Sequence, residues 1–413
     1  MAEKTASTGE LPFWERTPLQ VPEMASLLAL ISSTGRRKNL FRALLCAVLL
    51  ILLLQMSGSF IVVTRYARGG NPIDHVYNTT LGFQRVFAIN LPQRTDKRDL
   101  NTLAASFAGF EVDYLPGVEA EDVVEKAAPS NWDFDSQTPG ALGCWRAHMN
   151  ALQKIVAERI QTAMIIEDDA DWSPFIKDQL FELATGARAL QQSPDLTPSP
   201  YGHDWHFLWL GHNRIGPTDD NQNIWVVDDD FTVPPLPHRN SRWRQSHIPE
   251  DALRNDTRLF FKAYAGMCLY GYAVTYEGAR KMLSSLSAQP RNQPVDQSVS
   301  DMCRGKMAKG FDCYGVWPPL IATHRSAGYK SRDSDINNNE KTGWHEEYTF
   351  DIPFSTMMNI PRLADGATSV LSQWADVPIQ EVTFDLAIRS PPQGYLKNIN
   401  FGALPLRDDS ITI

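Results

Sequence analysis

Short uninterrupted apolar runs alternate along the chain with segments in which apolar residues recur at helical spacing. Three of these runs, residues 86–89, 163–166 and 207–210, each stop at a polar residue or a glycine. Continuous apolar runs are typical of strands that are buried on both faces of a sheet. After the first run, Leu100 and Leu103 begin a pattern with helical period. The alternation predicts an α/β fold with a mostly parallel sheet flanked by helices.

The same pattern predicts further elements toward the C-terminus. We expect helices from residue 145 and over residues 277–286, and strands over residues 267–274 and 315–321. Residues 216–256 form a long polar stretch rich in Asp and Pro. Uninterrupted loops of this length are usually functional or disordered, so we interpret the stretch as an inserted loop.

The longest apolar run lies near the N-terminus, over residues 43–63, and carries no charged residue. A membrane-spanning helix needs about 20 such residues. Basic residues are in excess before the run, which predicts a cytoplasmic N-terminus; they are Arg36, Arg37, Lys38 and Arg42. A cleaved signal peptide is the alternative, but the preceding segment is too long for one. We therefore expect a single-pass type II protein of the Golgi or endoplasmic reticulum membrane, with its C-terminal body in the lumen.

This topology divides the chain into five parts. We expect a cytoplasmic tail at 1–42, a transmembrane anchor at 43–63 and a stem at 64–84. A catalytic domain is expected at 85–350, followed by a C-terminal extension at 351–413, where the pattern weakens. The fold class is thus an α/β domain preceded by one transmembrane helix.

Two acceptor sequons for N-glycosylation, at Asn78 and Asn255, agree with a lumenal body. The five cysteines of the chain are too few for a disulfide scaffold. Cys303 and Cys313 could form a disulfide in an oxidising lumen, although the sequence does not establish it. No close pairing of cysteines and histidines resembles a zinc motif, so we expect no zinc site.

Composition narrows the class of protein further. With 43% hydrophobic residues the chain can bury a substantial core, and it is not a disordered stalk. The net charge of −9 argues against nucleic acid as a partner, because phosphate backbones are bound by clustered lysines and arginines. An acidic protein can still bind a nucleotide diphosphate when a divalent cation bridges the two.

The most informative segment is an acidic triplet, Glu167-Asp168-Asp169, which follows the apolar run at 163–166. Three crowded carboxylates repel one another, and hard divalent cations prefer oxygen ligands. In open α/β sheets the ligand crevice lies outside the carboxyl ends of the strands. The triplet therefore indicates a metal site, the alternative being a solvated acidic turn before a helix. Glu167 and Asp169 could face one side of an extended chain, although Asp169 and Asp171 have the same spacing.

Several motifs occur in an order that resembles glycosyltransferase family 25, which includes bacterial lipooligosaccharide and animal collagen galactosyltransferases. The matching segments are residues 86–98, 140–148, 165–169, 271–283, 294–296, 318–321 and 334–336. Ala147 stands where the family usually has a serine, which puts a hydroxyl role there in doubt. Relative to compact bacterial members, residues 216–256 look like an insertion. The resemblance spans about residues 85–336 and implies a GT-A-like fold and transfer of a sugar from a UDP-sugar with inversion.

The resemblance also implies a nucleotide site built from residues after the first strand. Asn90 would bind the base or ribose, and Arg94 and Arg98 would bind phosphate by charge-assisted hydrogen bonds. His148 and Asp168 complete the expected nucleotide-binding set. The alternatives are surface charge for the arginines and a purely structural role for the histidine.

The implied chemistry needs a divalent cation, Mn²⁺ or Mg²⁺, to stabilise the departing diphosphate. Glu167 and Asp169 are the favoured ligands, with Asp335 as a further acid and a solvated loop as its alternative. An inverting displacement also needs a base for the acceptor hydroxyl, and Asp296 is the candidate. An N-terminal helix cap is the other interpretation of Asp296.

The predicted function is a metal-dependent transferase that moves a sugar, galactose being one candidate, to a glycan or glycoprotein acceptor. Trp225 and Trp243 could stack on acceptor sugars, although anchoring of the loop is the simpler role. A catalytically silent lumenal glycan-binding protein is the main alternative. A hydrolase of phosphate esters is less favoured, because the nine histidines are scattered along the chain.

Overall fold

The protein is described by a computed structural model that covers residues 71–194, 197–218, 221–239, 256–289, 291–336, 342–384 and 393–400. The chain divides into two units, Met1–Arg68 and Gly69–Ile413, and all described residues belong to the second. The expected tail, the apolar run and residues 64–70 of the expected stem lie outside these ranges, as do Trp243 and Asn255, whereas residues 71–84 of the stem are described.

The expectation of a membrane-spanning helix ahead of the sheet is corrected. Throughout the described ranges, no helix combines the length and the apolar character needed to cross a bilayer. The run at 43–63, which motivated the expectation, is not among the described residues.

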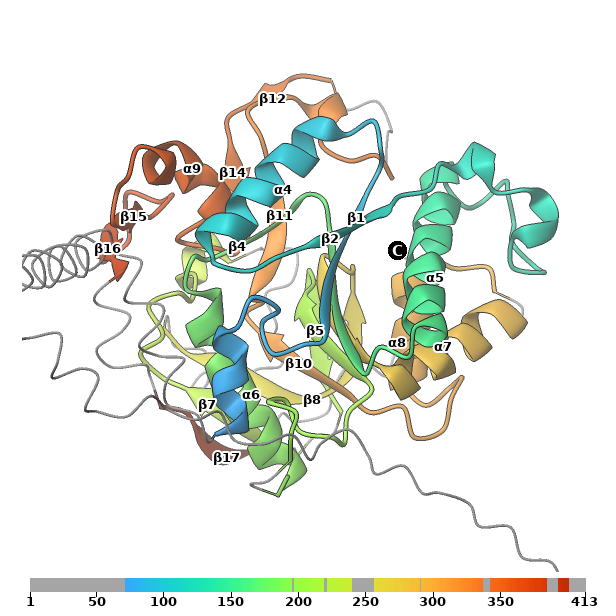
Figure 1. Ribbon diagram of the computed structural model, residues 1–413, viewed down its shortest axis with the longest axis horizontal. Helices are drawn as coiled ribbons and strands as arrows, with labels where there is room; N and C mark the ends of the chain where they lie inside the picture. The colour runs from blue at the N-terminus through green and yellow to red at the C-terminus, as the bar shows by residue number, and fades with distance from the viewer. Residues whose placement is uncertain are drawn as a thin grey trace, which may run out of the picture. The chain divides into compact units, whose positions relative to one another are not determined.

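The α/β part of the prediction is supported by a mixed sheet with a mostly parallel centre (Figure 1). The order of the central strands is β10 (Cys313–Trp317), β5 (Phe207–Gly211), β9 (Gly271–Thr275), β3 (Thr162–Glu167), β1 (Arg85–Asn90) and β2 (Asp113–Pro116). Strand β9 is antiparallel to both β3 and β5, and the other central strands share one direction. This layering fits a GT-A-like arrangement.

Antiparallel strands extend the sheet beyond β10. The order continues through β8 (Arg258–Met267) and β7 (Asn221–Val227) to β17 (Tyr395–Asn400). A short strand, β6 (Arg214–Pro217), also pairs with β8. Residues 216–256, expected as a loop, thus contribute strand β7, and a segment near the C-terminus completes the sheet.

Helices cover both faces of the sheet (Figure 1). On one face lie α4 (Thr95–Phe107), α6 (Ile176–Gln191) and α9 (Thr356–Ala364). On the other lie α5 (Pro139–Ala157), α7 (Tyr276–Ala288) and α8 (Val295–Cys303). Strand β1 contributes apolar side chains to both faces. Val86 packs on the side of α4, α6 and α9, and Phe87 packs on the side of α5, α7 and α8. Continuous apolar runs are the sequence pattern that such a sheet requires.

Shorter elements surround the acidic triplet. Strand β4 (Ala170–Trp172) follows it and pairs with β11 (Ile321–Arg325), which in turn contacts β14 (Tyr348–Thr349). Two small antiparallel pairs complete the described strands, β12 (Gly328–Tyr329) with β13 (Trp344–His345), and β15 (Ser369–Leu371) with β16 (Glu381–Thr383). The 3₁₀ helices are Pro72–Tyr77, Ala120–Asp122, Glu125–Ala127, Leu236–His238 and Lys330–Arg332.

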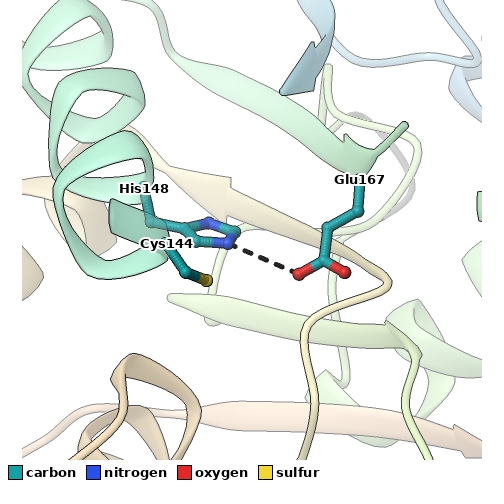
Figure 2. Close-up of side chains that lie close together, drawn as sticks. All are labelled: Cys144, His148 and Glu167. Atoms are coloured by element: carbon teal, nitrogen blue, oxygen red, sulfur yellow. Dashed lines mark ion pairs between the residues drawn. The ribbon is translucent and has the colours of Figure 1, made fainter. Parts of the chain in front are cut away.

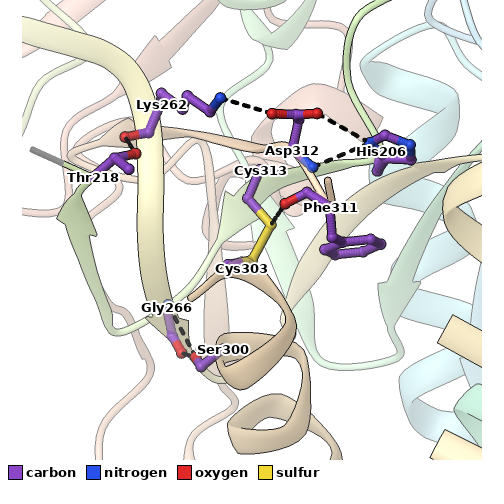
Figure 3. Close-up of a disulfide and its surroundings, with 9 residues drawn as sticks. All are labelled: His206, Thr218, Lys262, Gly266, Ser300, Cys303, Phe311, Asp312 and Cys313. Carbon is purple, nitrogen blue, oxygen red and sulfur yellow. Dashed lines mark hydrogen bonds and ion pairs between the residues drawn. A yellow bond between two sulfur atoms is a disulfide. The ribbon is translucent and has the colours of Figure 1, made fainter. Parts of the chain in front are cut away.

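A disulfide between Cys303 and Cys313 joins the end of α8 to the start of β10 (Figure 3). Near it, the Ser300 hydroxyl of α8 donates to the Gly266 carbonyl and accepts from the Gly266 amide at 3.1 Å. Asp312 forms an ion pair with Lys262 at 2.7 Å. The disulfide and the Ser300 hydrogen bonds attach α8 to the sheet and so fix the position of the helix that carries Asp296.

Candidate functional site

Several of the polar residues predicted for the site, Asn90 and the acidic triplet among them, lie at the carboxyl ends of β1 and β3. These strands are parallel neighbours, with Ile89 beside Glu167, so the residues that follow them lie at the same edge of the sheet. Asn90 ends β1, and Asp168-Asp169 form the turn between β3 and β4. Ligand crevices of α/β sheets form at this edge.

Asp168 is held by Asn90 and by a lysine that was not among the predicted site residues. The Asn90 amide donates to Asp168 Oδ2 at 2.9 Å, and Lys97 Nζ lies 3.2 Å from Asp168 Oδ1. Burial of this carboxyl raises its pKa to about 6, although Lys97 and Asn90 oppose the shift. Asp168 is therefore a buried acid whose charge is only partly compensated.

Asp335 joins the same ion-pair network from a distant part of the chain. Its carboxylate accepts from Arg94 Nη1 at 2.7 Å and from Lys97 Nζ at 2.6 Å. Burial alone would raise its pKa, but these two cations outweigh burial and hold the pKa below its ordinary value. Arg94 also pairs with Asp96 at 3.0 Å. The loop that carries Asp335 is thereby tied to the first turn of α4.

Asp169 pairs with Arg325 on β11, at 2.5 Å from its Oδ2. Burial opposes its charge, yet the Arg325 guanidinium and the Lys97 ammonium hold the pKa of Asp169 below its ordinary value. The other oxygen, Oδ1, is buried and has no hydrogen-bond partner among the described residues. An orphaned buried oxygen requires an explanation, and a missing ligand is one.

Basic side chains of the protein itself therefore compensate the negative charge of these acids. Each of Asp168, Asp169 and Asp335 lies beside a lysine or arginine. Asp169 Oδ1 still fits a divalent cation, because such ions are often held by one or two carboxylates together with substrate phosphates. Asp335 fits less well, since Arg94 and Lys97 already occupy its carboxylate.

Glu167 and Asp169 were expected to bind one metal ion together, but their side chains contact different residues. Its Oε1 lies 3.7 Å from Nε2 of His148, on α5, and Cys144 lies one helical turn before that histidine (Figure 2). The ligand atoms of these three side chains are all within 4.8 Å of one another. Nδ1 of His148 lies 3.0 Å from the hydroxyl of Tyr272.

Helix α5 can hold its two polar side chains here because its N-terminal turns pack closely. Thr138 caps the helix by accepting from the Ala141 amide at 3.3 Å, and Pro139 follows in the first turn. A side chain at Gly143 would collide with the Val118 carbonyl. The motif at 140–148 therefore places Cys144 and His148 on the face of α5 that points to β3.

Asp296, the predicted base, lies in the first turn of α8, whose N-cap is Pro294. Its Oδ2 accepts from the Cys268 amide at 2.8 Å and its Oδ1 from the Gln297 amide at 2.8 Å. Burial raises the pKa of the Cys144 thiol, and the charges of Glu167 and Asp296 raise it further. Asp296 is thus electrostatically coupled to the Glu167 side of the site, and it also stabilises its own helix terminus.

Two predicted residues lie apart from these contacts. The exposed Arg98 packs its guanidinium over the ring of Tyr114, 4.5 Å from the ring centroid. Trp225 lies on β7 against Gly186 of α6, where it contributes to the core. The contacts of Trp225 agree with the anchoring role rather than with sugar stacking.

Sequence reasoning did not select four residues that the structure brings into the site: Lys97, Cys144, Tyr272 and Arg325. Cys144 and His148 are four residues apart, a spacing that could have identified Cys144 if the helix had been expected to begin at Pro139, where the structure has it, and not at residue 145. No comparable signal marks Arg325, which reaches Asp169 across 156 residues of sequence.

Comparison with known proteins adds independent support for the enzyme class. The chain is 22% identical over 235 residues to a glycosyltransferase 25 family member of Anopheles gambiae, covering 54% of this chain and 32% of the relative. It is 22% identical over 240 residues to mouse procollagen galactosyltransferase 2, with 55% and 31% covered. Zebrafish procollagen galactosyltransferase 1 is 28% identical over 235 residues, with 54% and 32% covered.

No family model matches the chain. The aligned region spans about a third of the length of these curated relatives. Their similarity supports a glycosyltransferase related to family 25, in agreement with the order of motifs in the sequence.

Proposed function

We propose that the protein transfers a sugar from a UDP-sugar to a hydroxyl of a glycan or glycoprotein acceptor, with inversion at the anomeric carbon. The single observation that carries the proposal is the set of polar residues at the ends of β1 and β3, beside basic residues of α4. The named activities of the relatives support the same reaction class.

Arg94 and Lys97 are the groups that would bind the diphosphate of the donor. Both are cations at the N-terminal end of α4, where positive charge and the helix terminus favour an anion. In this structure both hold the carboxylate of Asp335, and we propose that the donor diphosphate takes the place of that carboxylate. Asn90, anchored to Asp168, would orient the nucleoside.

A divalent cation, Mn²⁺ or Mg²⁺, would supply positive charge to the departing diphosphate, with Asp169 as its protein ligand. Asp296 would accept the proton of the acceptor hydroxyl. In that displacement the acceptor oxygen forms the new bond to the anomeric carbon, the bond to the diphosphate oxygen breaks, and the proton moves to the carboxylate.

A catalytically silent glycan-binding protein is the second candidate. One observation favours it: the carboxylates of Asp168 and Asp335 both form internal ion pairs with Lys97. In either case we propose the lumen of the Golgi or endoplasmic reticulum as the compartment, since a disulfide is stable in an oxidising environment.

The test is release of UDP by the purified full chain from a panel of UDP-sugars, measured with Mn²⁺, with Mg²⁺ and with a chelator. Release that depends on one sugar, on an acceptor and on the metal supports the transferase. If no sugar gives UDP release while glycans bind on an array, the silent protein is correct.

A further inference from the structure

We propose that Cys144, His148 and Glu167 bind one transition-metal ion of the zinc class, at a site separate from the cation proposed on Asp169. Cys144 and His148 lie four residues apart on α5, and Glu167 ends β3 opposite them. Figure 2 shows the three side chains converging from the helix and the strand, and their ligand atoms lie within 4.8 Å of one another.

The orientation of His148 is the first argument. Its ring is buried, and Nδ1 lies at hydrogen-bond distance from the Tyr272 hydroxyl, 3.0 Å away. This contact turns Nε2 toward Glu167. Histidines that bind metals almost always use one ring nitrogen in this way while the other contacts an outer partner.

The gap between His148 and Glu167 is the second argument. Nε2 and Oε1 are 3.7 Å apart, which is too long for a hydrogen bond. Two ligands of one tetrahedral ion are about 3.4 Å apart when each metal bond is about 2.1 Å. Small side-chain adjustments would therefore place one ion between the two residues, with the Cys144 sulfur as the third ligand.

The charge of Glu167 is the third argument. Within the described ranges, it is the one acid of the triplet that has no ion pair with lysine or arginine, its only ion-pair partner being His148. Buried and half-buried carboxylates are normally paired or bind a metal. A cation at this position would give Glu167 the compensation that Lys97 and Arg325 give to Asp168 and Asp169.

The chemical types of the three ligand atoms indicate which metal the site would bind. A sulfur, an imidazole and a carboxylate suit zinc and related first-row ions, whereas Mg²⁺ prefers oxygen alone. Three protein ligands leave a fourth position for water or a substrate hydroxyl, as in catalytic zinc sites. This inference revises the expectation of no zinc site, which considered paired motifs and not the helical spacing of a single cysteine and histidine.

The test is titration of the metal-free full chain with Co²⁺ in the absence of oxygen and of added thiol, which keeps the Cys303–Cys313 disulfide intact, followed by absorption spectroscopy. We expect one equivalent to bind and to give both the visible bands of tetrahedral cobalt and a thiolate charge-transfer band. Cys144→Ser should remove the charge-transfer band, and Glu167→Gln should weaken binding at least tenfold. Tyr272→Phe, which removes only the outer hydroxyl, should weaken binding about 10- to 100-fold.

The controls separate this site from the proposed activity. Cys268→Ser changes the other free cysteine of the described residues and should keep the charge-transfer band. Asp169→Asn should also keep it, whatever happens to UDP release. The proposal is overturned if the wild type binds no Co²⁺, or if folded Cys144→Ser retains the charge-transfer band. Circular dichroism establishes that each variant is folded, and Glu167→Gln decides the question if Cys144→Ser does not fold.

Discussion

The ammonium group of Lys97 lies 3.2 Å from Oδ1 of Asp168, at the point where the acidic triplet turns away from the sheet. Burial disfavours the charge of Lys97, but the neighbouring carboxylates of Asp169, Asp168 and Asp335 raise its pKa above the ordinary value. A lysine of α4 therefore supplies positive charge that the sequence pattern alone assigned to a metal ion.

Replacing Lys97 should test this role. Lys97→Met leaves Asp168 and Asp335 without a shared cation, and breaking a buried pair costs about 3–5 kcal/mol of unfolding free energy. Urea unfolding measures the loss. In an Asp168→Asn background the same change should cost clearly less, and strict additivity would contradict the coupling. Lys154→Met, which breaks the exposed pair with Glu158, is the control and should cost less than about 1 kcal/mol.

Asp169→Asn should lower the rate of metal-dependent UDP release at least about 100-fold, the order of effect seen when one group that stabilises transition-state charge is removed. The amide keeps the size of the side chain, so circular dichroism should show a folded protein. Glu277→Gln, an exposed acid on α7, should leave turnover unchanged. Normal turnover of Asp169→Asn would exclude this residue from the reaction.

His212 should make stability depend on pH. The side chain is buried beyond the end of β5, its Nε2 is 2.7 Å from the Val316 carbonyl, and burial lowers its pKa to about 4. Between pH 4 and about 6.5 the unfolded chain binds a proton that the folded protein does not. The unfolding free energy therefore contains the full contribution of His212 above about pH 6.5. It decreases by about 3 kcal/mol as the pH falls to 4.

Unfolding free energies measured across this range check the prediction for His212. The pH dependence of His212→Gln should be shallower than that of the wild type, whereas His203→Gln, at an exposed position, should not change it. If the unfolding free energies of wild type and His212→Gln change with pH in parallel, this histidine does not contribute to the pH dependence.

The disulfide between Cys303 and Cys313 closes a loop of sequence separation 10. In the chain-entropy account, a loop of this size contributes roughly 2–3 kcal/mol to stability. Reduction, or the Cys303→Ser variant, should lower the unfolding free energy by that amount. Mass spectrometry after alkylation, with and without reductant, verifies the bond; labelling of both cysteines without reductant would refute it.

Sequence pattern predicted the strands that are buried on both faces and failed where the backbone turns within an apolar segment. Strands β1, β3 and β5 fall within or beside the expected runs. The single strand expected at 267–274 is interrupted, because Cys268 has a positive φ of 65° and separates β8 from β9. Strand β7 escaped prediction because it begins with polar residues, and its pairing with β17 is a long-range contact.

The residues of the candidate site were likewise predicted only in part. The acidic triplet and Asn90 could be assigned to one edge of the sheet from the strand pattern alone. The partners of these residues could not, because the rotation of α4 about its axis decides that Lys97 and not Arg98 faces the carboxylates. From the sequence alone we could not tell which of these two neighbouring basic residues would face the carboxylates.

Strand β17 forms one edge of the main sheet and pairs with most of β7, from Tyr395 beside Val226 to Asn400 beside Asn221. A protein shortened to end at residue 384 would leave the amides and carbonyls of β7 unpaired along that margin. Such an uncovered border is a template for adding strands from other molecules. Shortened versions made for expression or crystallisation should therefore self-associate, even though strand β17 itself carries none of the residues that we assign to the reaction.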